Sequence, residues 1–170
     1  MSGGRLIVVM GVSGCGKSTL GQALAQALPG SAFVDADDLH SREAKAQMAR
    51  GEPLTDAQRL PWVQRLCDTV TDHGRRGQTL VLAYSGLKTA HRARLRSLGV
   101  PAYWIWLEGE AGLLDARLTS RTGHFMPAAL LASQLAAMEP PARDDPRVLT
   151  LAIDASPQQQ LDRALSWLSR

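Results

Sequence analysis

Residues 11–18 read Gly-Val-Ser-Gly-Cys-Gly-Lys-Ser and match the pattern G-x-x-x-x-G-K-[ST] at every fixed position. An apolar run, Arg5–Met10, precedes them, and apolar residues at helical spacing follow from Leu20 to Leu28, before Pro29-Gly30. The glycines allow the backbone to curl so that its N–H groups point at phosphate oxygens, and the start of the helix adds a positive field. The sequence therefore predicts a phosphate site between the first strand and the first helix.

Two side chains of this loop have predicted roles toward ATP and its metal ion. Lys17 is expected to reach the β- and γ-phosphates, and Ser18 to ligate Mg²⁺. A merely flexible turn is the alternative, and the strand before and helix after the loop disfavour it. The residues predicted to contact the nucleotide here are Gly11, Val12, Ser13, Gly14, Cys15, Gly16, Lys17, Ser18 and Thr19.

Strand and helix patterns alternate along the rest of the chain. Further strands are predicted at Ala32–Val34, Thr79–Tyr84, Ala102–Leu107 and Val148–Ile153, with amphipathic helices between them. This alternation predicts an α/β fold in three layers, with a five-stranded parallel sheet flanked by helices, in a single domain spanning 1–170. Ligands of such sheets bind beyond the carboxyl ends of the strands. Polar segments directly follow the second and third strands, so we expect both to meet the loop in one cleft.

Composition narrows the class of protein. The 170 residues are 45% hydrophobic and 21% charged, with a net charge of +3, as expected of a soluble globular domain. No run of five like charges points to a nucleic-acid partner, and no apolar stretch is long enough for a membrane span, so a cytoplasmic protein is expected. Cys15 and Cys67 form neither a disulfide framework nor a zinc pattern.

Other proteins with this loop carry signals that are missing here. The chain contains no asparagine, and none of its three lysines completes the Thr-Lys-x-Asp version of the guanine-recognition motif, which disfavours a GTPase switch. Large motor ATPases place an aspartate after an apolar strand, where this chain has Ser85 after Thr79–Tyr84. Small size and the missing aspartate fit the compact kinases that resemble nucleoside-monophosphate and shikimate kinases, in which acidic residues after the second strand serve the metal and the acceptor.

Seven segments of the chain resemble the gluconokinase family in order and spacing, and the similarity extends from Leu6 to Asp154. The chain departs from the family's usual residues at Ser41, Ala44, Gly86 and His91. The matching segments are Met10–Thr19 (MGVSGCGKST), Asp35–His40 (DADDLH), Met48–Leu54 (MARGEPL), Asp56–Trp62 (DAQRLPW), Ser85–Lys88 (SGLK), Arg121–Phe125 (RTGHF) and Ser133–Pro140 (SQLAAMEP).

The resemblance implies a P-loop kinase fold with a small helical lid over about 121–138. It implies transfer of phosphate from ATP, with Mg²⁺, to the 6-hydroxyl of D-gluconate, by a protein that is often a homodimer. A kinase of another small hydroxy acid, such as shikimate, and a non-catalytic ATP-binding module are the alternatives. Neither a shikimate kinase nor an adenylyl sulfate kinase needs the R-x-G-H-F and G-E-P-L segments found here.

Acidic and imidazole groups after the second strand are predicted to serve the acceptor. Asp37 is expected to orient the acceptor hydroxyl and take its proton, and Asp35 to serve Mg²⁺. The alternative is that both aspartates cap the following helix. His40 is expected to bond a substrate hydroxyl, or else to be a surface or capping histidine.

Cationic side chains are predicted to bind the acceptor's carboxylate. The candidates are Arg59, Lys88 and Arg92. Arg59 could instead pair with Asp56 on its own helix, and Arg92 could lie on a solvated helix face.

The remaining site residues come from the predicted lid. Arg121 is expected to close on the transferring phosphoryl group, and Arg117 to stack on adenine. His124 and Gln134 are expected to line the acceptor pocket. An ordinary loop between helices is the alternative.

Overall fold

The computed structural model describes residues 3–109 and 131–170. Its centre is a parallel sheet with the strand order β2-β3-β1-β4-β5, which confirms the predicted five-stranded sheet. In β1, Leu6 pairs with Leu80 of β3 on one side and with Ala102 of β4 on the other. The strands are β1 (Leu6–Met10), β2 (Ala32–Asp35), β3 (Leu80–Ala83), β4 (Ala102–Glu108) and β5 (Val148–Ala152).

Both faces of the sheet are covered, which explains why the strands lack polar alternation. Every residue of β1 is fully buried. Leu6, Val8 and Met10 belong to one hydrophobic cluster, and Ile7 and Val9 belong to another on the opposite face. The predicted three-layer architecture is confirmed.

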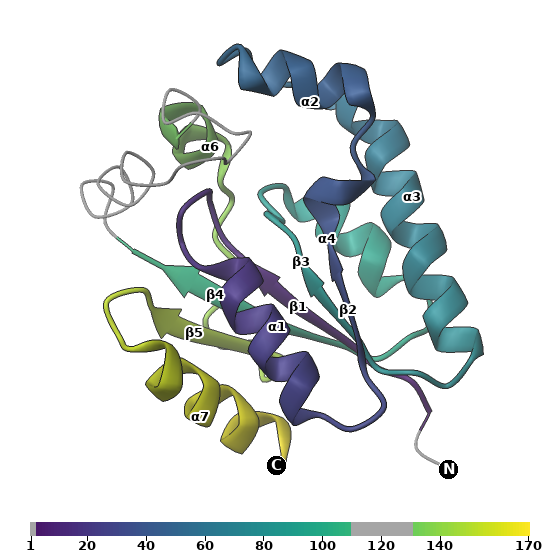
Figure 1. Ribbon diagram of the computed structural model, residues 1–170, viewed down its shortest axis with the longest axis vertical. Coiled ribbons are helices and arrows are strands. Elements are labelled where there is room, and N and C mark those ends of the chain that lie inside the picture. The colour runs from purple at the N-terminus through teal and green to yellow at the C-terminus, as the bar shows by residue number, and fades with distance from the viewer. Residues whose placement is uncertain (1–2, 110–130) are drawn as a thin grey trace.

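Helices from different parts of the chain build the two outer layers (Figure 1). One face carries α3 (Asp56–Arg75) and α4 (Thr89–Arg96), whose buried apolar residues join the cluster of Leu6. The other face carries α1 (Lys17–Ala27) and α7 (Pro157–Leu168), whose apolar residues join the cluster of Ile7. Cys67 is buried on α3, where it is 5% exposed.

Shorter elements lie beyond the carboxyl ends of the strands (Figure 1). They are the 3-10 turn η1 (Ala36–Leu39), α2 (Arg42–Ala49) and α6 (Leu131–Ala137). The turn η1 was not predicted from the sequence. The helix predicted over 113–121 lies outside the described residues. Among the described residues, none of the helices combines the length and apolar character needed to cross a bilayer.

Strand β2 ends one residue later than the sequence pattern predicts. Asp35 is its last residue and pairs with Ala83 of β3. Because the ladder fixes the backbone of Asp35, its carboxylate is held at the edge of the sheet where ligands of this fold bind.

Candidate active site

The loop between β1 and α1 has the conformation that its glycines allow. Gly16 precedes α1 in the left-handed region, with a φ of +98°. Gly11 has a φ of +148°, and a Cβ there would lie 2.8 Å from the carbonyl oxygen of Leu107 and 2.7 Å from Sγ of Cys15. A side chain at either position would strain or displace this loop.

The side chains at the start of α1 meet the end of β2. Oγ of Ser18 donates a 2.6 Å hydrogen bond to Oδ2 of Asp35. The other carboxylate oxygen of Asp35 accepts a 3.0 Å bond from the backbone N–H of Asp37, so Asp35 caps η1 as the alternative reading expected. The capping bond uses Oδ1, and Oδ2 remains beside Ser18.

The pair Ser18 and Asp35 has the chemistry of a magnesium site. Mg²⁺ prefers hard oxygen ligands and commonly takes one or two from the protein, with phosphate and water supplying the rest. Across residues 3–109 and 131–170, no group of three or more His, Cys, Asp or Glu side chains could hold a metal by itself. The two oxygens therefore fit a Mg²⁺ ion that arrives with a phosphate ligand.

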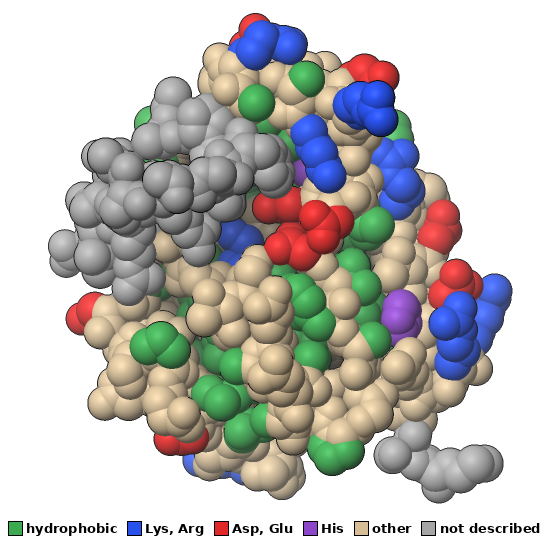
Figure 2. Space-filling view, viewed as in Figure 1, with side chains coloured by type: hydrophobic (Ala, Val, Ile, Leu, Met, Phe, Trp, Pro, Cys, Tyr) green, Lys and Arg blue, Asp and Glu red, His purple; other side chains and the backbone are tan. Residues whose placement is uncertain are grey.

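An open cavity lies beside the phosphate loop. Figure 2 shows acidic side chains grouped near the middle of this face, with a basic side chain next to them. The lining residues come from the loop, η1, the α2–α3 region, the loop after β3, and α6: Ser13, Lys17, Asp37, His40, Met48, Pro53, Leu54, Arg59, Trp62, Ser85, Leu87, Ser133 and Gln134.

Of the predicted acceptor residues, Asp37, His40, Arg59 and Gln134 line this cavity together with Lys17. Lys88 precedes the first residue of α4 and follows Leu87, which lines the cavity. Arg117, Arg121 and His124 lie outside the described residues, so their roles stay predictions.

The ring of His40 is stacked on Trp62. The ring centroids are 3.9 Å apart and the planes differ by 20°. Trp62 is itself fixed by a 2.6 Å bond from its Nε1 to the carbonyl of Ala36, and by an edge contact with Tyr84 at 5.3 Å. The imidazole is therefore held in one orientation at the cavity wall.

His40 is buried as well as stacked, being 8% exposed, so the reading of it as a surface histidine is wrong. Its Nδ1 has no hydrogen-bond partner in the described part of the chain. Burial, together with the nearby positive charges of Lys45, Arg65 and Arg59, lowers the pKa of His40 to about 4. The imidazole is neutral near pH 7 and can bond a hydroxyl group as donor or acceptor.

This pKa makes stability depend on pH. Between pH 6.5 and about 4 the unfolded chain protonates His40 and the folded chain does not, so the free energy of unfolding falls as pH drops through this range. We expect His40 to account for about 3 kcal/mol of that fall, and His40→Gln to lose it. Denaturant unfolding of both proteins from pH 4.5 to 7 measures the difference, and identical pH slopes would contradict the burial argument.

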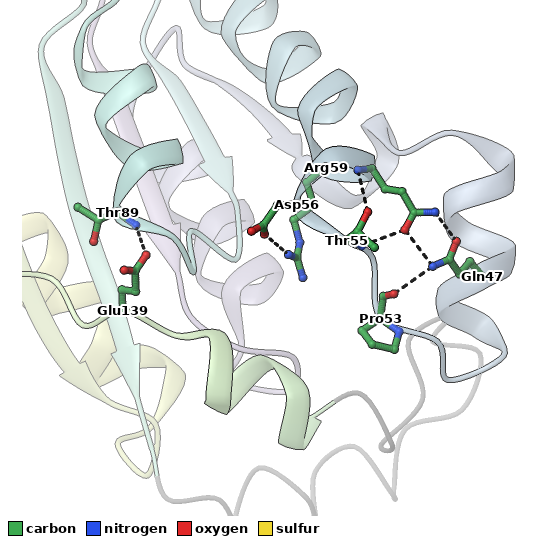
Figure 3. Close-up of polar contacts among 8 residues, drawn as sticks. Gln47, Pro53, Thr55, Asp56, Arg59, Thr89 and Glu139 are labelled. Carbon is green, nitrogen blue, oxygen red and sulfur yellow. Dashed lines mark hydrogen bonds and ion pairs between the residues drawn. The ribbon is translucent and has the colours of Figure 1, made fainter.

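Arg59 pairs with Asp56, as the alternative expected, and its binding of an acceptor carboxylate stays a prediction. Its guanidinium lies 3.0 Å from the carboxylate of Asp56, and it also lines the cavity. The turn that carries it is fixed, because Thr55 and Gln58 form a capping box at the start of α3. Gln58 also exchanges hydrogen bonds with Gln47 of α2 (Figure 3). Arg59 therefore projects from a braced helix start.

Arg92 lies in a different setting from the one predicted. It is 4% exposed, so the reading of a solvated helix face is wrong. Its guanidinium donates to the carbonyl oxygens of Gly86 and, at 2.7 Å, Glu139. It thus joins the loop after β3 to the segment after α6, and its contact with an acceptor carboxylate stays a prediction.

Apolar residues of the cavity wall were not among the site residues predicted from the sequence. Trp62 is both buried and part of the cavity wall. Met48 and Leu54 form a small apolar cluster at the same wall. Met48, Leu54 and Trp62 lie in segments that resemble the family. The spacing of residues in those segments does not predict how α2 and α3 are rotated, and this rotation turns the side chains toward the cavity. The departure Ser41 caps α2, since its Oγ accepts a 3.1 Å bond from Ala44 N–H.

Comparison with known proteins gives the class and then the family. A family model described as an AAA domain matches residues 6–141, and together with the loop and sheet it defines a P-loop kinase. A gluconokinase of Gluconobacter oxydans (strain 621H) is 43% identical over 142 residues, covering 84% of this chain and 79% of that protein. This chain therefore belongs to the gluconokinase family.

Solved structures agree with that assignment. An unliganded sugar kinase from Janibacter sp. HTCC2649 has a TM-score of 0.89 and 39% identity, covering 98% of this chain and 95% of that one. A gluconokinase from Sinorhizobium meliloti 1021 has a TM-score of 0.86 and 36% identity, covering 99% and 93%. The resemblance stated from the sequence segments is confirmed.

Proposed function

We propose that this chain transfers the γ-phosphoryl group of ATP to the 6-hydroxyl of D-gluconate, giving 6-phospho-D-gluconate and ADP. One observation carries the proposal: a single cavity is lined by Ser13 and Lys17 of the phosphate loop and by Asp37, His40 and Arg59. The groups proposed to bind phosphate and those proposed to bind the acceptor thus line the same cavity. Membership of the gluconokinase family supports gluconate as the acceptor over other small hydroxy acids.

Groups that line or adjoin the cavity can take the proton and neutralise the charge in the transfer step. The acceptor oxygen forms a bond to the γ-phosphorus as the bond from that phosphorus to the β–γ bridging oxygen breaks. Asp37 takes the proton of the hydroxyl group, and Lys17 neutralises charge on the phosphoryl oxygens. When bound at Ser18 and Asp35, Mg²⁺ would supply further neutralisation of the phosphates.

The acceptor chemistry fits a polyhydroxy acid. The guanidinium of Arg59 can pair with a carboxylate, and Lys88 stands close in the chain to the cavity residue Leu87. The neutral His40 can bond a hydroxyl group of the acceptor chain. Arg121 acting on the phosphoryl group, Arg117 on adenine and His124 on the acceptor complete the proposed site.

We also propose that the protein works in the cytoplasm as a homodimer, without a nucleic-acid or membrane partner. The family resemblance supports the dimer, and the mild net charge of +3 supports the absence of a nucleic-acid partner. Light scattering after gel filtration would report twice the chain mass of 18.3 kDa for a dimer.

A substrate screen tests the proposed acceptor. ADP release is measured with D-gluconate, other sugar acids, shikimate and nucleoside monophosphates. We expect kcat/KM for D-gluconate to exceed each alternative by at least about 100-fold, because a buried polar site penalises acceptors that leave its groups unpaired. Phosphorus NMR of the product would place the phosphate on the 6-oxygen. Turnover of shikimate but not of gluconate would overturn the assignment.

A further inference from the structure

One side chain of helix α6 forms a hydrogen bond with the backbone of the phosphate loop. Oε1 of Gln134 accepts a 2.7 Å hydrogen bond from the backbone N–H of Ser13. The two residues are 121 positions apart in the chain, so this bond is a tertiary contact between the loop and the helix. Both residues also line the cavity.

The bonded amide is one that a phosphate can use. Amides of such a loop bind phosphate oxygens because several N–H groups converge on one concave surface. An amide oxygen is a hydrogen-bond acceptor as a phosphoryl oxygen is, but it carries no charge. Gln134 therefore occupies, with a neutral oxygen, an acceptor position on the loop.

The position lies on the acceptor side of the loop. Ser13 and Lys17 line the same cavity as Asp37, and the transferring phosphoryl group must pass between the loop and Asp37. In the proposed reaction, the terminal phosphate, rather than the α- or β-phosphate, is thus the group expected to meet the Ser13 amide and Gln134. Lys17 at present donates a 3.1 Å bond to the Val12 carbonyl, a second contact that a phosphate would replace.

The helix that carries Gln134 is anchored just after its end. The N–H of Glu139 donates to the carbonyl of Leu87 at 2.8 Å, and the carboxylate of Glu139 accepts from Thr89 N–H at 2.9 Å (Figure 3). Arg92 bonds the carbonyl of Glu139 as well. These bonds hold the segment that follows α6, so a rotation of the Gln134 side chain would release Ser13 without moving this end of the helix.

We propose that Gln134 couples binding of the terminal phosphate to binding of the acceptor. The γ-phosphoryl group displaces its oxygen from Ser13, and the released amide then bonds a hydroxyl group of the acceptor. This inference rests on the proposed kinase function and adds a direction to it: nucleoside triphosphate raises acceptor affinity, and nucleoside diphosphate does not. By linkage, the acceptor raises triphosphate affinity by the same factor.

Calorimetry with Mg²⁺ and either ADP or a non-hydrolysable ATP analogue tests the displacement. Gln134→Met keeps the length of the side chain and removes the competing oxygen. We expect the analogue to bind this variant about threefold to tenfold more tightly than wild type, the worth of one hydrogen bond, with ADP affinity unchanged. Gln134→Glu places a negative charge at the amide and should weaken the analogue by more than about tenfold.

The second half of the proposal is tested by titrating D-gluconate. In wild type the analogue should tighten gluconate binding at least about threefold and ADP should not, and Gln134→Met should lose this difference. Ala136→Met, on the exposed side of α6, is the matched control and should behave as wild type in every titration. Thermal unfolding of each variant separates local effects from loss of fold.

Different results would overturn the displacement, the coupling and the proposed function. Unchanged or weaker analogue binding in a folded Gln134→Met variant would overturn the displacement. Equal gluconate affinity with analogue and with ADP in wild type would overturn the coupling. Absence of gluconate turnover in the wild-type screen would instead overturn the proposed function. It would leave the displacement at Ser13 standing, because that displacement is measured with nucleotide alone.

Discussion

Lys17→Ala is expected to lower kcat/KM for the kinase reaction by at least about 10³-fold. The ammonium group is the one positive side chain of the phosphate loop, and it lines the same cavity as Asp37. Phosphoryl transfer depends mainly on alignment and on neutralising charge at the phosphoryl oxygens, so one removed charge has a large effect. A coupled assay of ADP release with saturating D-gluconate measures the loss.

The fold of this variant should remain intact. Lys17 makes one described hydrogen bond, from Nζ to the Val12 carbonyl, and its loss costs about 1 kcal/mol. In a domain of this size, that lowers Tm by about 2–4 °C. Arg163→Ala, which removes an exposed positive charge from α7, is the control and should keep wild-type turnover. A folded Lys17→Ala protein with normal kcat would contradict the catalytic reading of the loop.

The fold was predictable because its signals are local in the sequence. Five apolar runs mark the strands, and each is followed by a helical stripe, so a parallel sheet with two covered faces is the consistent arrangement. The alternating side chains of β1 enter two separate cores, which local composition already implied. The ends of the strands were harder to predict. Asp35 belongs to β2 because it pairs with Ala83 of β3, and a pairing between strands is a tertiary contact that local sequence does not show.

The site was predictable only where residues follow strands directly. Asp35 ends β2, Asp37 lies in the turn that follows it, and Lys17 follows the phosphate loop. All three therefore lie at the carboxyl ends of parallel strands, which explains why they are close together. The stacking of His40 on Trp62 depends instead on how α3 is rotated against η1. Arg92 shows the same limit: its charge suggested a ligand, but the path of the chain after α6 brings the Glu139 carbonyl within 2.7 Å of it.

Asp37→Asn is expected to lower kcat by about 10²–10⁴-fold while changing the affinity for ATP less than threefold. Asp37 lines the cavity from η1, and its own backbone N–H is held by Asp35. Asparagine keeps the shape of the side chain but cannot take a proton from the acceptor hydroxyl. Because the nucleotide phosphates are bound by the loop, the loss should fall on the chemical step, and single-turnover kinetics with D-gluconate would measure it.

The neighbouring residue provides the matched control for this change. Asp38 is in the same 3-10 turn and is exposed, so Asp38→Asn removes the same charge one residue from the cavity wall. If general electrostatics of η1 drove the reaction, both variants would slow it alike. A large fall in kcat for Asp37→Asn alone assigns the proton transfer to that carboxylate. Equal rates for Asp37→Asn and wild type would leave Asp37 a purely structural part of the turn, and the base would have to be sought elsewhere.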